Sequence, residues 1–267
     1  MNTEPSVADP SRDRLPRRRH RLARCRGCGL HEAICVCPLL PRVDLPQEFL
    51  VIQNAIEILR PTNTGRIVAT MLPNTRLMPY GVREGSMAAD VQARDAEAPH
   101  RAEAVATDGG RRGERRSLPF DDAPLRRADT DYLLLFPSDD AVDLSAEMAA
   151  PRPGRRVAFV LLDGTWHQAS RMSHRIAALR GMRRVKLPPG APSSWTIRNP
   201  LRPEQLCTLE AAIRVTDVLG RHEEADRMMD GLELIEARML FMKGRLPRPM
   251  TIEEVRAQRT KSETMEG

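Results

Sequence analysis

The sequence predicts an α/β fold in which helices cover both faces of a parallel sheet. Residues 132–136 and 157–162 are uninterrupted apolar runs, a pattern typical of strands buried on both faces. The second run leads directly into residues 166–179, where apolar residues recur at helical spacing. With 267 residues, the chain is long enough to bury a full-sized core of this kind.

Shorter patterns predict the remaining elements. Residues 49–52 and 185–187 are apolar enough for short strands. Helices are expected at 67–72, from 206–212 onward and at 223–243, and the apolar stripe of the last one should face the core.

Composition divides the chain into parts that should fold and parts that should not. Residues 1–24 are rich in arginine and poor in apolar residues, so we expect a disordered basic arm, and the same composition predicts a disordered insertion at 84–129. Residues 25–40 form a cysteine-rich segment and residues 41–245 the main domain. Residues 246–267 form a polar C-terminal tail.

The charge balance indicates an anionic partner. The formal net charge is +6, and most of the excess is arginine, whose planar guanidinium suits bidentate contact with phosphate. An arginine-rich composition without any nucleic-acid partner is the alternative. No apolar stretch approaches the roughly 20 residues needed to span a bilayer, so we expect a cytoplasmic protein with no membrane contact.

Four cysteines within thirteen residues, Cys25, Cys28, Cys35 and Cys37, predict a structural metal site. Without a secretory signal, zinc held by four thiolates is favoured over disulfides. A redox pair, or reduced cysteines that bind nothing, are the alternatives, and His31 is a possible substitute ligand.

The string Asp163-Gly164-Thr165-Trp166 follows the second apolar run, where open α/β sheets bind their ligands. Asp163 or Thr165 can cap the following helix, and Trp166 can belong to the core, so a purely structural interpretation stays open at this point.

Two further segments place polar side chains at helix starts. Thr62, Asn63, Thr64, Gly65 and Arg66 form a turn before the predicted helix at 67–72, and can either cap it or hold an anion. Thr208 and Glu210 lie in the first turn of a later helix, where they can face a site or complement the helix dipole.

Taken in order, these strings resemble the DTW-domain family over most of residues 25–240. The resemblance rests on the four cysteines, the 62–66 turn, Asp163-Gly164-Thr165-Trp166, and Arg198 followed by Cys207-Thr208-Leu209-Glu210-Ala211, in which Cys207 replaces a serine. Two departures are Asn54-Ala55, where many members have His-Pro, and the long insertion.

The resemblance implies a knotted core like that of the SPOUT enzymes, so that residues 41–245 would be the catalytic domain. It also implies transfer of the 3-amino-3-carboxypropyl group of S-adenosylmethionine to N3 of a tRNA uridine, with release of methylthioadenosine. The partner would be tRNA rather than DNA, and the protein a monomer or a homodimer.

The same resemblance suggests residue roles. Asp163 is the candidate base for the N3 proton, beside Thr165, and Trp166 can pack on adenine or on an unstacked uridine. The 62–66 turn, Arg198, Thr208 and Glu210 are the candidate handles for the donor. A SPOUT-like methyltransferase and a zinc-knuckle RNA-binding protein without catalysis are the competing hypotheses.

Overall fold

The computed structural model describes residues 24–86, 88–89, 116–197 and 205–266, and its centre is a six-stranded sheet. The strands follow the order β2-β1-β5-β3-β6-β4 and every pair is parallel, which confirms the predicted α/β class. Their bounds are β1 Glu48–Asn54, β2 Thr75–Tyr80, β3 Thr130–Leu135, β4 Val142–Asp143, β5 Arg156–Asp163 and β6 Arg183–Lys186.

The neighbouring strands β1 and β5 are buried on both faces, which explains their continuous apolar sequences. Alternate residues of β1 enter two different cores: Phe49 and Val51 pack into one, and Leu50 and Ile52 into the other. Such a strand has no solvent face, so the alternation of apolar and polar residues disappears.

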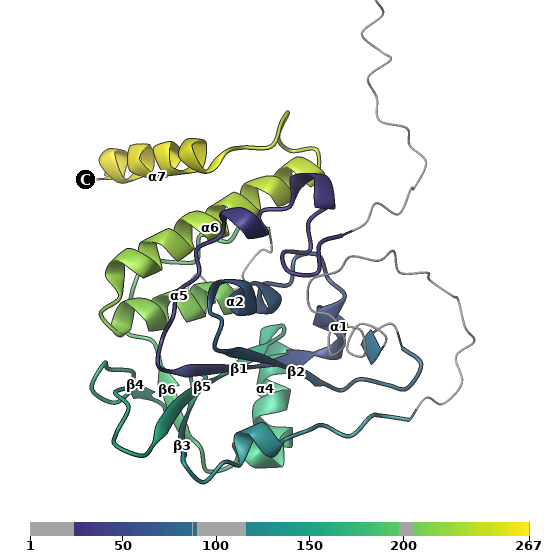
Figure 1. Cartoon of the computed structure of the whole chain (residues 1–267), viewed down its shortest axis with the longest axis vertical. Coiled ribbons are helices and arrows are strands. Elements are labelled where there is room, and N and C mark those ends of the chain that lie inside the picture. The colour runs from purple at the N-terminus through teal and green to yellow at the C-terminus, as the bar shows by residue number, and fades with distance from the viewer. Residues whose placement is uncertain (1–23, 87, 90–115, 198–204, 267) are drawn as a thin grey trace, which may run out of the picture.

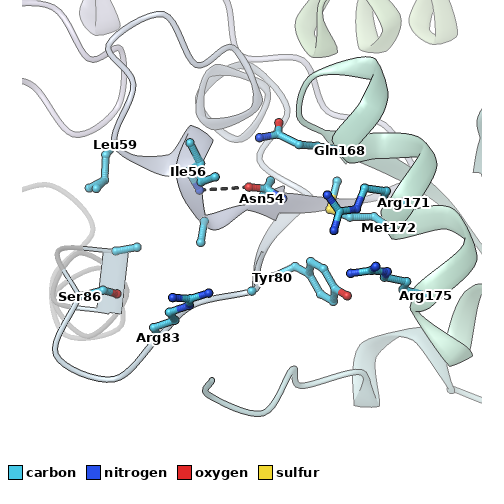
Figure 2. Close-up of a pocket in the computed structure, with 13 residues that line it drawn as sticks. Asn54, Ile56, Leu59, Tyr80, Arg83, Ser86, Gln168, Arg171, Met172 and Arg175 are labelled. Atoms are coloured by element: carbon cyan, nitrogen blue, oxygen red, sulfur yellow. Dashed lines mark hydrogen bonds between the residues drawn. The ribbon is translucent and has the colours of Figure 1, made fainter. Parts of the chain in front are cut away.

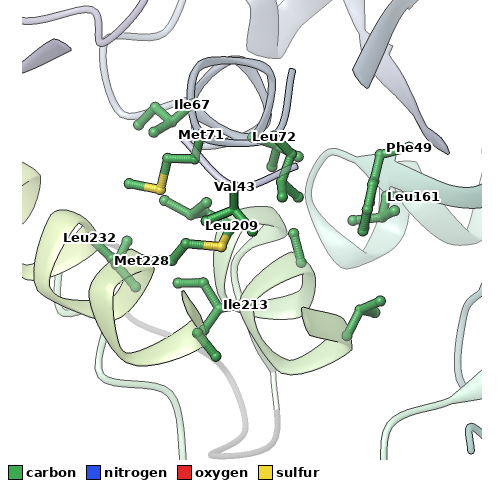
Figure 3. Close-up of a cluster of buried hydrophobic side chains, with 14 of the residues drawn as sticks. Val43, Phe49, Ile67, Met71, Leu72, Leu161, Leu209, Ile213, Met228 and Leu232 are labelled. Atoms are coloured by element: carbon green, nitrogen blue, oxygen red, sulfur yellow. The ribbon is translucent and has the colours of Figure 1, made fainter. Parts of the chain in front are cut away.

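Helices α2 (Gly65–Met71), α5 (Thr208–Val218) and α6 (His222–Met242) cover one face of the sheet, as Figure 1 shows. Met71, Leu209 and Met228 belong there to one buried cluster with Phe49 and Leu161 of the sheet (Figure 3). Helix α4 (Trp166–Arg175) covers the other face, where Met172 packs on the second core. The short helix α1 (Ala55–Ile58) directly follows β1.

The cysteine-rich segment is part of the larger core. Cys28, Leu30, Val36 and Leu40 are buried in the same cluster as α2 and α6. The turn depends on Gly29, which has a left-handed φ of +74° and packs against the Pro61 carbonyl before α2. The segment therefore contacts the turn that leads into α2.

Two segments differ from expectation. The prediction of one helix over 166–179 is wrong in its last turn, because α4 ends at Arg175 and Ile176 is extended before a 3₁₀ turn, Ala177–Leu179. The polar tail contains helix α7 (Ile252–Glu266), and Arg256 pairs with Asp230 of α6 at 2.6 Å.

Residues 1–23 of the predicted arm, and residues 87 and 90–115 of the predicted insertion, lie outside the described residues. Within the described part of the chain, no helix is long and apolar enough to cross a membrane.

Candidate active site

A crevice is expected between the carboxyl ends of β1 and β5, because the chain leaves these neighbouring strands in opposite directions. From β1 it passes through α2 to β2 on one side, and from β5 it passes through α4 to β6 on the other. Such a switch point is where open parallel sheets bind ligands. Gln53 and Asp163 lie opposite each other here as the last paired residues of β1 and β5.

Asp163 connects three segments at this switch point. Its side chain is only 4% exposed. Thr208 Oγ1 donates to Oδ1 at 2.7 Å, Gln53 Nε2 donates to Oδ2 at 3.2 Å, and Asn63 Nδ2 also donates to Oδ2. The carboxylate thereby joins β1, the turn before α2 and the first residue of α5.

The helix starts around Asp163 favour a negative charge at this position. Thr208 begins α5 and Gly65 begins α2, and the amino ends of helices carry a partial positive charge. Asp163 is not the cap of its own helix: Thr165 is the N-cap of α4 and forms a capping box with Gln168. Of the two residues that the sequence offered as the cap, Asp163 and Thr165, the structure therefore uses Thr165.

Gly65 is required by the close approach of Asp163. A Cβ on Gly65 would lie 2.5 Å from the Asp163 Cγ and Oδ2 atoms. Glycine to alanine in a helix normally stabilises a protein by roughly 0.5–1 kcal/mol. Here we expect Gly65→Ala to lower the free energy of unfolding by about 1–3 kcal/mol, because the new methyl group displaces the carboxylate.

Urea unfolding of Gly65→Ala measures this effect. Gly190→Ala is the matched control, because a Cβ there meets at closest the guanidinium of Arg214, the far end of a flexible side chain. A Gly65→Ala protein as stable as the wild type would contradict the described contact.

The 62–66 turn is largely used to build the site itself. Asn63 Oδ1 accepts from the Arg66 backbone N–H at 3.1 Å and from Gln53 Nε2 at 3.2 Å. The Arg66 guanidinium donates to the backbone carbonyls of Ile58 and Arg60. Thr62 is half-buried and Thr64 is buried. Arg66 thus holds the preceding loop, a use that the sequence did not indicate.

Trp166 is the exposed aromatic residue of the site. Its side chain is 36% exposed, and its ring centroid lies 6.1 Å from that of Phe136, which follows β3. Arg184 of β6 lies over the other ring of this pair, 6.0 Å from the Phe136 centroid. The two rings provide flat apolar surface at the carboxyl ends of β3 and β5.

Glu210 is buried and anchors the loop after β6. Its carboxylate accepts from the Ser193 hydroxyl at 2.8 Å, from the Ser194 backbone N–H at 2.8 Å and from the Cys207 backbone N–H at 2.7 Å. Burial, and next the charge of Glu210, raise the pKa of the Cys207 thiol well above its ordinary value, so this thiol stays protonated and is a poor nucleophile. Arg198 lies outside the described residues.

A basic pocket adjoins the switch point, and the sequence did not predict it. It has a volume of about 770 Å³ and lies between the loops after β1 and β2 and the outer face of α4. Figure 2 shows Arg171 and Arg175 of α4 on one side of Tyr80 and Arg83 on the other. The one available signal was the spacing of four residues between Arg171 and Arg175 on a predicted helix.

The four predicted metal ligands lie together. The Sγ atoms of Cys25, Cys28, Cys35 and Cys37 all lie within 4.8 Å of one another. Cys25 and Cys37 are 3.5 Å apart and Cys28 and Cys35 are 3.8 Å apart. A tetrahedral zinc with bonds of about 2.3 Å requires sulfur atoms about 3.8 Å apart. The donor set and its dimensions therefore fit zinc.

Two further features favour a cation at this cluster. A Cβ on Gly27 would lie 2.8 Å from the Cys37 Sγ, so glycine is needed for the sulfur atoms to converge. Burial, followed by the hydrogen bond with Cys25 and the charges of Cys28 and Cys25, raises the pKa of the Cys35 thiol to about 12. A divalent cation would reverse this shift by coordinating the thiolates.

Comparison with known families identifies the chain. The model of the DTW domain matches residues 22–240, which include the cysteine cluster, the Asp163 network and most of α6. This protein belongs to the DTW-domain family. The resemblance drawn from the ordered motifs is thereby confirmed.

The curated relatives of this DTW-domain protein match most of its length at modest sequence identity. One from Mus musculus, tRNA-uridine aminocarboxypropyltransferase 2, is 25% identical over 202 residues, 74% of this chain and 57% of its own length. A relative of the same name from Drosophila melanogaster is 30% identical over 221 residues, 81% of this chain and 71% of its own. The chain thus spans little more than half of the mouse protein. No solved structure matches it.

Proposed function

We propose that this DTW-domain protein is a tRNA-uridine aminocarboxypropyltransferase that uses S-adenosylmethionine as donor. The main support is the buried Asp163 network, which assembles separate motifs of the family at the switch point of a parallel sheet. The names of the mouse and fly relatives supply the reaction class. We also propose, from the same resemblance, that the core of the domain contains a knot like that of the SPOUT enzymes.

In the proposed reaction, N3 of the uridine forms a bond to the γ-carbon of the donor's side chain while the bond from that carbon to sulfur breaks. The electron pair of the broken bond leaves with methylthioadenosine. The N3 proton must pass to a base, and a well-placed base contributes about 10²–10⁴-fold to the rate. The donor must also present its γ-carbon, rather than its methyl group, about 3–3.5 Å from N3.

Asp163 is the proposed proton acceptor, and Thr208 is the proposed link between it and the substrate. Asp163 is almost fully buried, whereas the side chain of Thr208 is only half-buried and donates to Oδ1 at 2.7 Å. The Thr208 hydroxyl would take the N3 proton while passing its own proton to Asp163. The three hydrogen bonds to Asp163 hold this pair in position.

The remaining candidate residues receive roles that agree with their contacts. Trp166, next to Phe136, is the proposed surface for adenine or the unstacked uridine, and Thr165 positions it by capping α4. Asn63, Arg66 and Glu210 form hydrogen bonds within the protein, so we assign them to positioning the loops of the donor site. Arg198, with Thr62, Thr64 and Gly65, remains the candidate holder of the donor's carboxylate.

The four cysteines would hold a structural zinc ion. Four thiolates leave no open coordination position, so we assign this ion no step in the reaction.

Mass spectrometry of nucleosides tests the proposed function. Unmodified tRNA is incubated with the protein and S-adenosylmethionine, with the donor omitted in a control, and then digested. We expect a uridine heavier by one aminocarboxypropyl group, together with methylthioadenosine. A methylated nucleoside would instead establish a methyltransferase, and tRNA that is bound tightly but never modified would establish a binding protein.

A further inference from the structure

We propose that the pocket between Arg83 and α4 binds the phosphate backbone of the RNA strand next to the target nucleotide. The lining of this basic pocket includes Asn54, Ile56, Arg83, Gln168, Arg171 and Arg175. The inference deepens the proposed function and rests on it, because it assigns the RNA substrate to a defined surface.

The charge of the basic pocket is positive and uncompensated. Three of the lining residues are arginines and none is acidic. Arg83, Arg171 and Arg175 are exposed, and within the described residues their guanidinium groups form no ion pair. Several other arginines in the described part of the chain are paired with a carboxylate: Arg127, for example, pairs with Glu48. The three guanidinium groups are therefore available to an external anion.

The side-chain amides of Asn54 and Gln168 add hydrogen-bond donors to the basic pocket, but few free acceptors. Asn54 Oδ1 already accepts from the Ile56 backbone N–H at 3.1 Å, and Gln168 Oε1 accepts from the Thr165 backbone N–H at 2.7 Å. What remains of each amide is its NH₂ group. The pocket thus presents mainly hydrogen-bond donors, which suit a ligand made of acceptor oxygens.

Several features favour an RNA strand over a small anion. Arg171 and Arg175 are four residues apart on α4, so their Cβ atoms lie about 5–6 Å apart along the helix, and Arg83 lies across the opening (Figure 2). Together these three arginines span more space than a single carboxylate can occupy. Ile56 and Leu59 are 62% and 41% exposed beside it, and offer apolar surface to a base.

The position of the basic pocket connects it to the reaction. Asn54 follows Gln53, which donates to Asp163, and Gln168 belongs to the capping box that begins two residues after Asp163. A strand bound to Arg171 and Arg175 would therefore pass the carboxyl ends of β1 and β5. Asp163 and Gln53 face the α2 and α5 side of the sheet, so an unstacked uridine from this strand would have to reach around the carboxyl ends of β1 and β5 to approach Thr208 and Asp163.

Salt-dependent binding of unmodified tRNA to Arg171→Gln/Arg175→Gln tests the inference. The matched control is Arg152→Gln/Arg156→Gln, which removes the same charge from exposed arginines near the opposite end of β5. We expect the α4 variant to bind tRNA about tenfold or more weakly at low salt. Its plot of log affinity against log salt should be shallower by roughly 1.4–1.8, as expected for two lost phosphate contacts. The control should keep the wild-type slope of this plot, apart from the small change that the loss of any two positive charges causes.

Two further measurements separate the possible outcomes. The affinity for S-adenosylmethionine should be the same in both variants, and loss of donor binding with unchanged tRNA binding would overturn the inference in favour of a donor carboxylate site. If the wild type modifies tRNA and both variants bind tRNA with equal slopes, only the inference fails. If the wild type neither binds nor modifies tRNA, the proposed function fails as well. Thermal unfolding should be unchanged in the α4 variant and little changed in the control, whose two lost ion pairs lie on the surface.

Discussion

Replacing Asp163 by asparagine is expected to lower kcat by about 10²–10⁴-fold, because the amide cannot accept the N3 proton. The exchange keeps the shape of the side chain and retains one oxygen as acceptor. At least one donor among Gln53, Asn63 and Thr208 then loses its carboxylate partner. We expect this loss to cost about 1–3 kcal/mol of the free energy of unfolding.

Thr208 variants distinguish lost chemistry from lost structure. Thr208→Ser keeps the hydroxyl that donates to Asp163 and should keep most of kcat. Thr208→Val removes the hydroxyl but leaves the hydrogen bonds from Gln53 and Asn63, and should lower kcat nearly as far as Asp163→Asn. Single-turnover product formation, measured with bound tRNA and donor, gives these rates. An Asp163→Asn protein within threefold of the wild-type rate would exclude Asp163 as the base.

Removing the metal from the cysteine cluster is expected to destabilise the main domain by several kcal/mol. Structural zinc in small domains contributes roughly 10–16 kcal/mol of apparent binding free energy. Cys28 is fully buried and lies in the same core as α2 and α6, so an open knuckle would expose that core to water. The turn carrying Asn63 should also loosen, because Gly29 packs against the carbonyl of Pro61.

Denaturant unfolding with and without a chelator measures this effect, alongside the metal content of the protein. Cys28→Ser should behave like the chelated wild type. Cys207→Ser is the matched control, since Cys207 lies outside the cluster at the N-cap of α5, where a serine caps at least as well. Equal stability of metal-free and zinc-loaded protein would show that the cysteines bind no structural metal.

The sequence predicted the buried centre of the fold better than its edges. Strands β1, β3 and β5 were recognised because burial on both faces leaves a continuous apolar run. Strand β2 was missed because it is an edge strand in which Met78 is the one buried residue and Pro79 interrupts the pattern. Strand β4 has only two residues, both exposed.

The individual residues of the site were easier to predict than their contacts. Asp163, Asn63 and Thr208 were singled out by their motifs, but their mutual hydrogen bonds join positions far apart in the chain. Gln53 was missed because one glutamine at the end of a strand carries no local signal. Arg83 and Arg171 come together only through the tertiary fold, and the same is true of the loop contacts of Glu210.

The strand order also determines when the protein can fold during synthesis. Strand β1 is parallel to β5, and Gln53 pairs with Asp163, which is translated 110 residues later. At about 5–20 residues per second, β1 leaves the ribosome roughly 5–20 s before its partner exists. During this interval one edge of β1, which carries the apolar run Phe49 to Ile52, is open to self-association. The nascent chain should therefore depend on chaperones until residue 163 has emerged, and Asp163, the proposed proton acceptor, is the residue that completes this pairing.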